Sequence, residues 1–232
     1  MREHWSTDAW RLLRSMEDEW LSIHNQPNIN LAIINPLNSL ITSMIAFMGL
    51  NRESISREHG WAVLDAGRKI EYSLLLVNML SVLADKHDEE VDYNLQESIL
   101  ISSESLVNYR YKYRAPIQLS LVLDLMLFDP NNPRSLLYQV ERLKFNLDVL
   151  PNSQNGNQPA DHNKLIAKLF TLLEAAQKDH LSELDNKRNN YKNLEIFLSG
   201  IHDLLMQIPE VISRVYFEHA QTQKQLFIAE NI

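Results

Sequence analysis

The stretch REHGWAVLDAGRKIEYSLLLVNMLSVLADK, residues 57–86, decides the fold because its pattern changes halfway. At about 100° per residue, the first half as a helix has an apolar side and a polar side. The apolar side carries Val63, Leu64, Ala66, Gly67 and Ile70, and the polar side carries Trp61, Asp65, Arg68 and Tyr72. From Leu74 to Ala84 only Asn78 and Ser81 interrupt an apolar run. The second half is therefore apolar on nearly every side, which predicts a helix that enters a core made by other helices.

The composition favours helices along the whole chain. The 232 residues include five glycines and eight prolines, and 45% are hydrophobic, which is enough for a substantial core. We expect an all-α fold, a multi-helix bundle of about seven to nine mostly antiparallel helices with no significant sheet. We also expect one helical domain over residues 1–232. Its candidate internal boundary is residues 151–160, PNSQNGNQPA, where turn-forming and polar residues are concentrated.

Charge and cysteine content exclude several functional classes. The formal net charge is −8 and no long run of Lys and Arg is present, whereas nucleic-acid-binding surfaces are basic. No cysteine is available for disulfides or thiolate metal sites, which is typical of a reducing compartment. No apolar stretch approaches the roughly 18 residues that a membrane span requires. We therefore expect a cytoplasmic protein that binds neither nucleic acids nor membranes.

Further helices are predicted before and after this stretch. Apolar residues at three- and four-residue spacing near the start of the chain are Trp10, Leu13, Met16, Trp20 and Ile23. Residues 37–48 carry a second apolar face, which follows Asn35-Pro36 and ends at Gly49. Beyond residue 160, apolar residues at helical spacing predict an antiparallel helix pair, with a kink or break at Pro209.

One ion pair is predicted in the core. If residues 93–114 form a single helix, Arg110 lies on its apolar side. A guanidinium group keeps its charge, so a buried one requires a carboxylate or carbonyl partner. Asp124 is the one charge in the apolar run 119–128. We therefore predict a structural ion pair between Arg110 and Asp124.

The sequence lacks the common catalytic motifs. Its glycines form neither a P-loop nor a G-x-G-x-x-G turn, and no G-x-S-x-G or H-E-x-x-H is present, so we predict no cofactor, no metal and no catalytic residue. What remains is a set of charged side chains at core-like positions, namely Asp65, Arg68, Glu71, Arg110, Arg134, Glu141 and Arg142. They either form interhelical ion pairs, which is the favoured interpretation, or line a cleft whose arginines hold a carboxylate or phosphate ligand.

Three blocks of sequence resemble a known family. They are REHWSTDAWRLL at 2–13, GLNRESISREHGWAVLDAGRKIEYS at 49–73, and NYRYKY at 108–113 followed by LVLDLMLFDPNNPRSLLYQVERL at 121–143. Together they are similar to the bacterial Alpha-E family, a helical domain named for its Glu-Arg motif. The positions that match are Trp61, Asp65, Gly67, Arg68, Glu71, Tyr109, Arg110, Asp129, Pro133, Arg134 and Ser135. At one motif position this chain has Glu71-Tyr72, whereas Glu141-Arg142 is intact, so the resemblance carries no arginine role to position 72.

The resemblance implies a partner. Alpha-E domains are often fused to, or encoded beside, a circularly permuted ATP-grasp domain of the carboxylate-amine ligase type. It therefore implies a non-catalytic accessory domain that works with a peptide- or amide-forming ATP-grasp ligase domain in cis or in trans. The chain has no counterpart of the family's N-terminal helices and their first Glu-Arg element, so we expect it to be part of a longer polypeptide.

Two other functions stay open at this point. One is a small-molecule- or peptide-binding domain, or an enzyme, with a cleft lined by Arg and Glu. The other is a structural oligomerisation domain, which would expose an apolar patch. The sequence identifies neither a ligand nor an oligomeric state.

Overall fold

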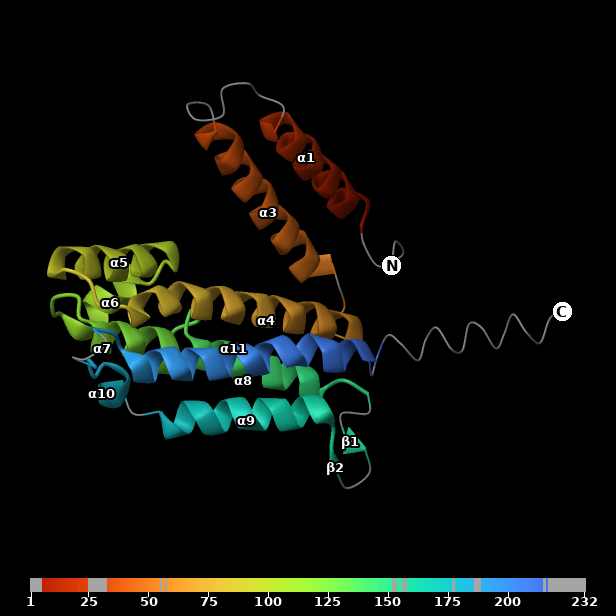
Figure 1. Ribbon diagram of the computed structural model, residues 1–232. Coiled ribbons are helices and arrows are strands. Elements are labelled where there is room, and N and C mark those ends of the chain that lie inside the picture. The colour runs from red at the N-terminus through yellow and green to blue at the C-terminus, as the bar shows by residue number, and fades with distance from the viewer. Residues whose placement is uncertain are drawn as a thin grey trace. The chain divides into compact units, whose positions relative to one another are not determined.

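The computed structural model describes residues 6–24, 33–54, 56, 58–151, 154–155, 158–176, 178–185, 189–214 and 216 (Figure 1). The all-α prediction is confirmed, because the described residues are mainly helical. The one described sheet is a pair of two-residue antiparallel strands, β1 (Gln154–Asn155) and β2 (Gln158–Pro159). No helix among the described residues is long and apolar enough to cross a membrane.

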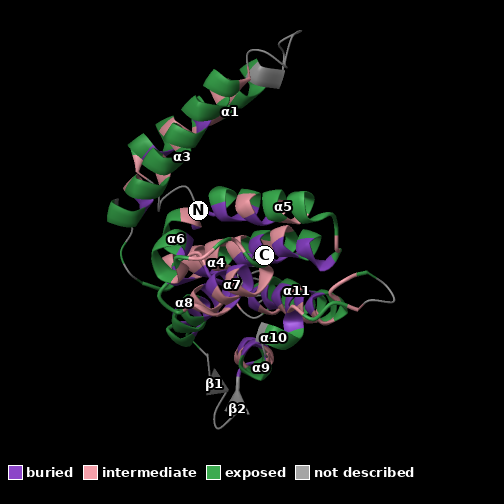
Figure 2. Cartoon of the chain, turned by 90° about the vertical axis from the view of Figure 1, so that its left-hand side faces the viewer, coloured by how far each residue is buried: buried purple, intermediate pink, exposed green. Residues whose placement is uncertain are grey.

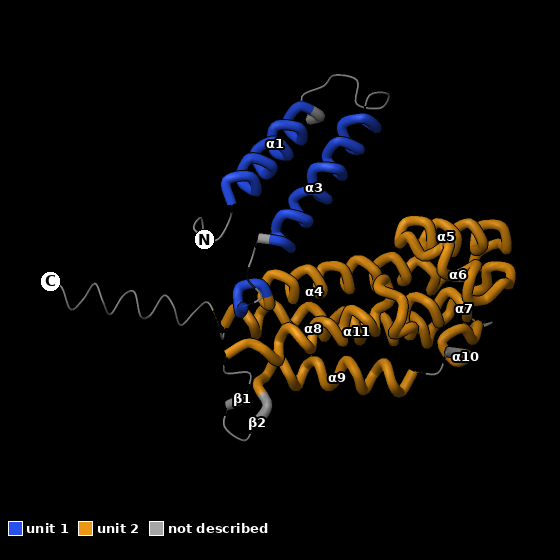
Figure 3. Tube along the Cα trace, turned by 180° about the vertical axis from the view of Figure 1, so that it is seen from behind, with its two compact units in different colours: residues 1–61 blue, residues 62–232 orange. Residues whose placement is uncertain are grey.

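The chain divides into two compact units, residues 1–61 and 62–232 (Figure 3). The first unit contains α1 (Thr7–His24) and α3 (Ile34–Ser54), which pack against each other as a hairpin. Ser39 on α3 donates a hydrogen bond to the Glu19 carboxylate on α1, at 2.8 Å. Among the described residues of this hairpin, the buried apolar side chains are Ala9 and Leu40. The two helices therefore share very little core.

The second unit is a helical bundle. Its elements are α4 (His59–Ser81), the 3-10 turn η2 (Val82–Ala84), α5 (Glu89–Ser102), α6 (Leu106–Tyr113), α7 (Leu119–Leu123), the π-helical η3 (Asp124–Phe128), α8 (Leu136–Asp148), α9 (Asp161–Ala175), α10 (Lys178–Leu181) and α11 (Lys192–Ser213). Figure 1 shows α4, α8, α9 and α11 lying alongside one another, with α5 and α6 at one end. Helix α9 packs against both α8 and α11 and runs opposite to each. The predicted antiparallel pair beyond residue 160 is thus α9 and α11.

The stretch that decides the fold supplies part of this core. The buried positions of α4 recur every three or four residues and are Ala62, Ala66, Ile70, Ser73, Leu76, Val77 and Leu80. The expectation that its second half is surrounded on nearly every side is wrong, because Leu75 is 56% exposed and Val82 is also exposed. Helix α4 therefore keeps one side toward solvent. The neighbouring α5 likewise has exposed residues on its outer side and buried ones toward the bundle (Figure 2).

The proposed internal boundary at residues 151–160 lies within the second unit. This segment connects α8 to α9, and those helices pack together, so the chain makes a hairpin there. The division into compact units falls instead after Trp61, in the first turn of α4. Helix α11 continues through Pro209 to Ser213, so the chain does not break at that proline.

Residues 93–114 form two helices, which overturns the prediction for Arg110. Helix α5 ends at Ser102, Glu104 has a left-handed backbone (φ 53°), and α6 begins at Leu106. The helical phase restarts there and places Tyr109, which is fully buried, toward the core. Arg110, about 100° further round, points to solvent with 66% of its side chain exposed and lies 3.5 Å from the carboxylate of Glu97. The predicted pair between Arg110 and Asp124 is therefore wrong.

Candidate functional site

The charged residues proposed as a ligand site are dispersed over the second unit. Asp65, Arg68 and Glu71 lie on α4, Arg110 lies on α6, Arg134 precedes α8, and Glu141 and Arg142 lie on α8. Asp65 accepts a hydrogen bond from the amide of Asn146 at 2.8 Å, while Glu71, Glu141 and Arg142 are exposed. The Arg142 guanidinium group lies 5.2 Å from the ring centre of Tyr138. Their role in binding a ligand stays a prediction.

One of these arginines, Arg134, lies beside Tyr72, the residue that replaces the arginine of the Glu-Arg motif. The Arg134 guanidinium carbon lies 5.7 Å from the ring centre of Tyr72, and its Nη2 is 3.0 Å from the Glu104 carboxylate. The Tyr72 hydroxyl is 3.5 Å from the Arg134 carbonyl oxygen, to which it donates. An arginine at position 72 would bring a second cation beside Arg134, whereas the tyrosine ring attracts it.

A polar cavity lies where α6, η3 and the turn after η3 meet. Its volume is about 370 Å³, and its lining residues are Asn108, Tyr111, Lys112, Leu125, Asp129, Asn131 and Asn132. Apart from Leu125, they come from two short segments, NYRYKY and DPNNP, that are about 20 residues apart in the chain. Both segments belong to the blocks that carry the family resemblance, and the fold brings them together at this cavity.

A lysine that lines the cavity lies between two aspartates. Lys112 Nζ lies 2.8 Å from Asp129 Oδ2 and 3.2 Å from Asp124 Oδ2. The Tyr113 hydroxyl also donates a hydrogen bond to Asp124 Oδ2. Asp124 is thus the lone charge of its apolar run, as the sequence indicates, but the α6 side chains that donate to it are Lys112 and Tyr113, and Arg110 does not. The π-helical turn that starts at Asp124 is of a kind often found at functional sites.

The local protonation states follow from burial and these hydrogen bonds. Burial opposes the charge of Lys112, but its hydrogen bonds to Asp129, Tyr113 and Asp124 outweigh it and raise its pKa above the usual value. Burial, together with the hydrogen bond to Asp124, raises the pKa of Tyr113. Burial also opposes the charge of Asp129, but hydrogen bonds from Lys112 and from the Asn131 N–H lower its pKa overall. At neutral pH the site therefore holds an ammonium group, an ionised Asp129 and a neutral phenol.

The turn that carries Asp129 is held by its own side chains. Asp129 Oδ1 accepts from the Asn131 N–H at 2.9 Å, and the Asn132 amide donates to the carbonyl of Leu125 at 3.1 Å. The Ser135 hydroxyl donates to the Asp129 carbonyl and accepts from the Tyr138 N–H, so it also caps α8. These bonds fix the carboxylate against Lys112 because they pin the turn to both η3 and α8.

The arrangement is suited to binding N–H groups. The lining holds one carboxylate, Asp129, and one ammonium group, Lys112, and its remaining polar groups are amide and phenol. Lys112 pairs both with Asp129 and with Asp124, which lies outside the lining. A phosphate or carboxylate ligand would have to compete with Asp129 and Asp124 for Lys112, which already pairs with both. Carboxylate and amide oxygens accept hydrogen bonds from a peptide backbone or an amine. The cavity therefore favours an amide- or amine-bearing partner over an anionic one.

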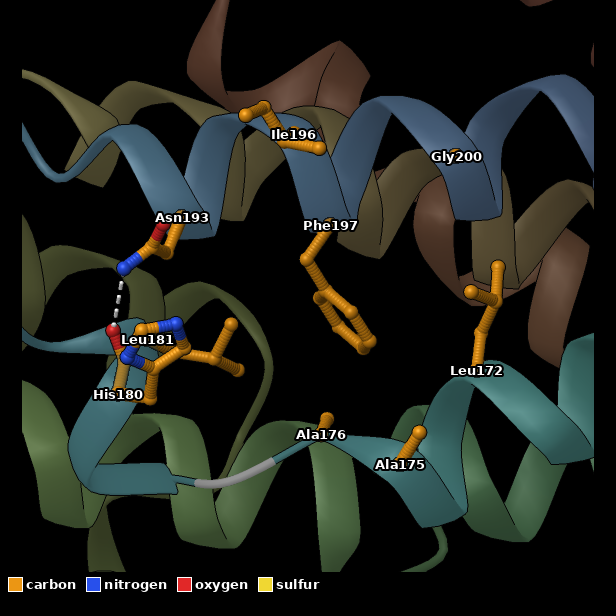
Figure 4. A pocket seen from close by; sticks show the side chains of 9 residues that line it. All are labelled: Leu172, Ala175, Ala176, His180, Leu181, Asn193, Ile196, Phe197 and Gly200. Atoms are coloured by element: carbon orange, nitrogen blue, oxygen red, sulfur yellow. Dashed lines mark hydrogen bonds between the residues drawn. The ribbon is translucent and has the colours of Figure 1, made fainter.

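A second cavity lies between α9, α10 and α11 (Figure 4). Its volume is about 510 Å³, and its lining is mostly apolar, with the Phe197 ring directed into it. At one end, the Asn193 amide donates to the His180 carbonyl at 3.1 Å, and the His180 ring lies 2.8 Å from Glu183. Neither this cavity nor the polar one is lined by the charged residues predicted from the sequence.

Sequence reasoning missed the residues of the polar cavity. It named Asp129 only as a position that matches the family and gave no role to Lys112. The available signal was Asp124, a lone carboxylate in an apolar run, which correctly required a partner. Within the described part of the chain, no group of three or more His, Cys, Asp or Glu side chains is placed to hold a metal ion.

Comparisons with known proteins agree with the sequence blocks. The model of the Alpha-E family, described as a predicted alpha-helical domain with a conserved ER motif, matches residues 1–217, well beyond residue 143 where the quoted blocks end. Uncharacterized proteins of Mycobacterium bovis and of two Mycobacterium tuberculosis strains are each 28% identical over 219 residues. That alignment covers 92% of this chain and 24% of each relative, so the chain spans about a quarter of their length.

No solved structure matches the chain. The family match therefore carries the identification, and it covers both compact units. The chain belongs to the Alpha-E family.

Proposed function

We propose that this chain is a non-catalytic accessory domain that docks on an ATP-grasp carboxylate-amine ligase domain, in cis or in trans. The observation that carries the proposal is the share of the mycobacterial relatives that it spans, which is 24%. In those proteins the segment similar to this chain is part of a much longer polypeptide. A helical domain without nucleotide motifs then acts through the domains beside it.

The polar cavity and its rim supply the contact in this proposal. Tyr111 and Val107 on α6 are 80% and 77% exposed, and Tyr111 also lines the cavity. Tyrosine is enriched among the residues that dominate binding energy at interfaces, because it joins apolar area to a hydroxyl group. Asp129 and Asn131 beside it carry side-chain oxygens that can accept hydrogen bonds from a backbone segment of the partner. An apolar contact rimmed by acceptors is typical of a protein-docking surface.

The test is direct binding between the full chain and the ATP-grasp ligase domain encoded in the same genome. We expect a dissociation constant at or below about 100 μM by calorimetry, which corresponds to about −5.5 kcal/mol. Tyr111→Ala removes the exposed ring at the cavity and should weaken binding at least about tenfold. Phe145→Ala on α8 is the matched control, because Phe145 is likewise an exposed aromatic residue, 61% exposed, and should leave binding unchanged.

Two outcomes would contradict this proposal. Absence of heat and of co-purification at concentrations above the expected dissociation constant would exclude the ligase domain as a partner. Equal loss of binding in the two alanine variants would show that α6 is not the contact.

A further inference from the structure

Helix α3 carries an apolar stripe that the described residues of its own hairpin leave exposed. Ile34, Leu37, Ile41, Met44 and Met48 are exposed and spaced alternately by three and four residues, and Ile45 extends the stripe. Their exposed fractions run from 36% to 67%. An alternation of three and four is the a/d pattern of a coiled coil, with Ile34, Ile41 and Met48 at a and Leu37 and Met44 at d. We call these six residues the α3 seam.

The seam is distinct from the face that α3 turns to α1. The positions toward α1 are Leu40 and the partly or fully buried residues Pro36, Ser43, Phe47 and Asn51, which lie about 100° away from the seam. Helix α3 is therefore apolar over a wide arc, of which α1 covers about half. A helix that is apolar over most of its circumference is normally buried.

The same side of the hairpin includes apolar residues of α1. Trp10, Trp20 and Leu21 are 37%, 55% and 51% exposed. The Glu19–Ser39 hydrogen bond lies on the side of the hairpin away from the seam. At about 100° per residue, these three side chains lie at least 100° from Glu19 around α1, which places them on the seam side. If a fully exposed large apolar residue presents about 200 Å², the seam and these three residues leave roughly 900 Å² uncovered. A stable protein–protein interface buries about 800 Å² per partner.

Charge also bears on what covers this surface. From Ile34 to Asn51 the sequence contains no Asp, Glu, Lys or Arg. A second α3 seam would therefore meet no like charge, and its own a/d side chains would supply the knobs and holes that this seam requires. A two-fold arrangement pairs one patch with the same patch of a second molecule and closes the assembly at two copies.

We infer that the α3 seam is the interface of a homodimer, in which the hairpins of two copies of this chain pack as a four-helix bundle. This contact gives the hairpin the core that Ala9 and Leu40 do not provide. The inference does not rest on the ligase partnership, which uses the second unit. Each can fail without the other.

The first test measures the mass of the full chain by size-exclusion chromatography with light scattering at tens of micromolar. We expect a dimer with twice the 27.0 kDa of one chain. Ile41→Lys places a charge at the centre of the seam on a residue that is 54% exposed, so the hairpin itself should tolerate it. The mass of this variant should halve, while its helical circular dichroism is retained. Thr42→Lys, an exposed neighbour about 100° further round, should remain dimeric.

A second test uses the absence of cysteine in the chain. Ile41 is midway between Ile34 and Met48, so two copies of Ile41→Cys face each other in either a parallel or an antiparallel arrangement. Mild oxidation should cross-link most of this variant as a dimer. Ala46→Cys, exposed on the opposite side of α3, should cross-link at least about tenfold less.

Three results would overturn the inference. They are a wild-type chain that is monomeric throughout the concentration range, assemblies that grow beyond two copies, and equal cross-linking of the two cysteine variants. A seam that binds the ligase domain while the chain alone stays monomeric would assign the surface to that partner instead.

Discussion

Replacement of Lys112 by methionine tests the polar site most directly. Methionine keeps an unbranched apolar chain but removes the ammonium group that lies 2.8 Å from Asp129 and 3.2 Å from Asp124. A hydrogen bond between charged groups in a sheltered place contributes about 1.5–3 kcal/mol. The Lys112 side chain is 39% exposed, so solvent screens part of both interactions. We therefore expect Lys112→Met to lower the free energy of unfolding by about 2 kcal/mol in total.

Urea denaturation at pH 7, followed by circular dichroism, measures this loss as a lower midpoint at unchanged slope. Lys144→Met is the matched control. Lys144 pairs with Asp148 one turn away on α8, with half of its side chain exposed, so its loss should cost less than about 0.5 kcal/mol. The difference between the two variants isolates what the sheltered site adds to an ordinary surface pair.

The pH dependence of this loss has a definite sign. The pKa of Asp129 is lowered in the folded chain, so its ionised form stabilises the fold above the unfolded-state value of about 4. That stabilisation is lost as the pH falls through the lower folded value. The difference between the wild type and Lys112→Met should therefore shrink below about pH 4. A loss no larger than that of Lys144→Met, or one that does not change with pH, would refute the charge argument.

Two further predictions concern a surface arginine and a buried histidine. Arg110→Ala should change the free energy of unfolding by less than about 1 kcal/mol in urea, because the Arg110 side chain that pairs with Glu97 is 66% exposed. A loss of about 3 kcal/mol would instead show that Arg110 is buried with a charged partner. Burial lowers the pKa of His162, against the charges of Asp148 and Asp161, and neither ring nitrogen has a hydrogen-bond partner among the described residues. The unfolded chain therefore binds more protons below its pKa of about 6.5, and stability should fall as the pH falls from about 7 to 5. His162→Leu should flatten that slope in urea midpoints measured at both pH values; an unchanged slope would contradict a neutral, buried ring.

The short-range features of the fold could be predicted from the sequence. Leu76 and Leu80 recur at helical spacing within one apolar run, and the structure buries both on α4. The helix pair beyond residue 160 and the mainly helical structure of the described residues follow from the same kind of pattern. Such patterns are readable because a helix is set by residues three and four positions apart, all within one segment.

The positions of single charges could not be predicted in this way. Periodicity predicts an inward Arg110 only if a single helix runs from 93 to 114. The left-handed backbone of Glu104 interrupts that helix. One such break shifts the phase of everything that follows. Tyr109 therefore takes the inward place, and its hydroxyl donates to the Pro116 carbonyl at 2.8 Å.

The polar site illustrates the remaining gap. From the sequence alone, Asp124 was recognised as a charge that needs a partner, since a lone carboxylate in an apolar run is costly to bury. That the partners are Lys112 and Tyr113, and that Asp129 joins them, depends on how α6 meets η3 and the turn after it. Local periodicity thus determined the helices by itself, and the resemblance of three sequence blocks indicated the family. Only the tertiary structure decided which side chains meet, because contacts between separate segments depend on the path of the chain between them.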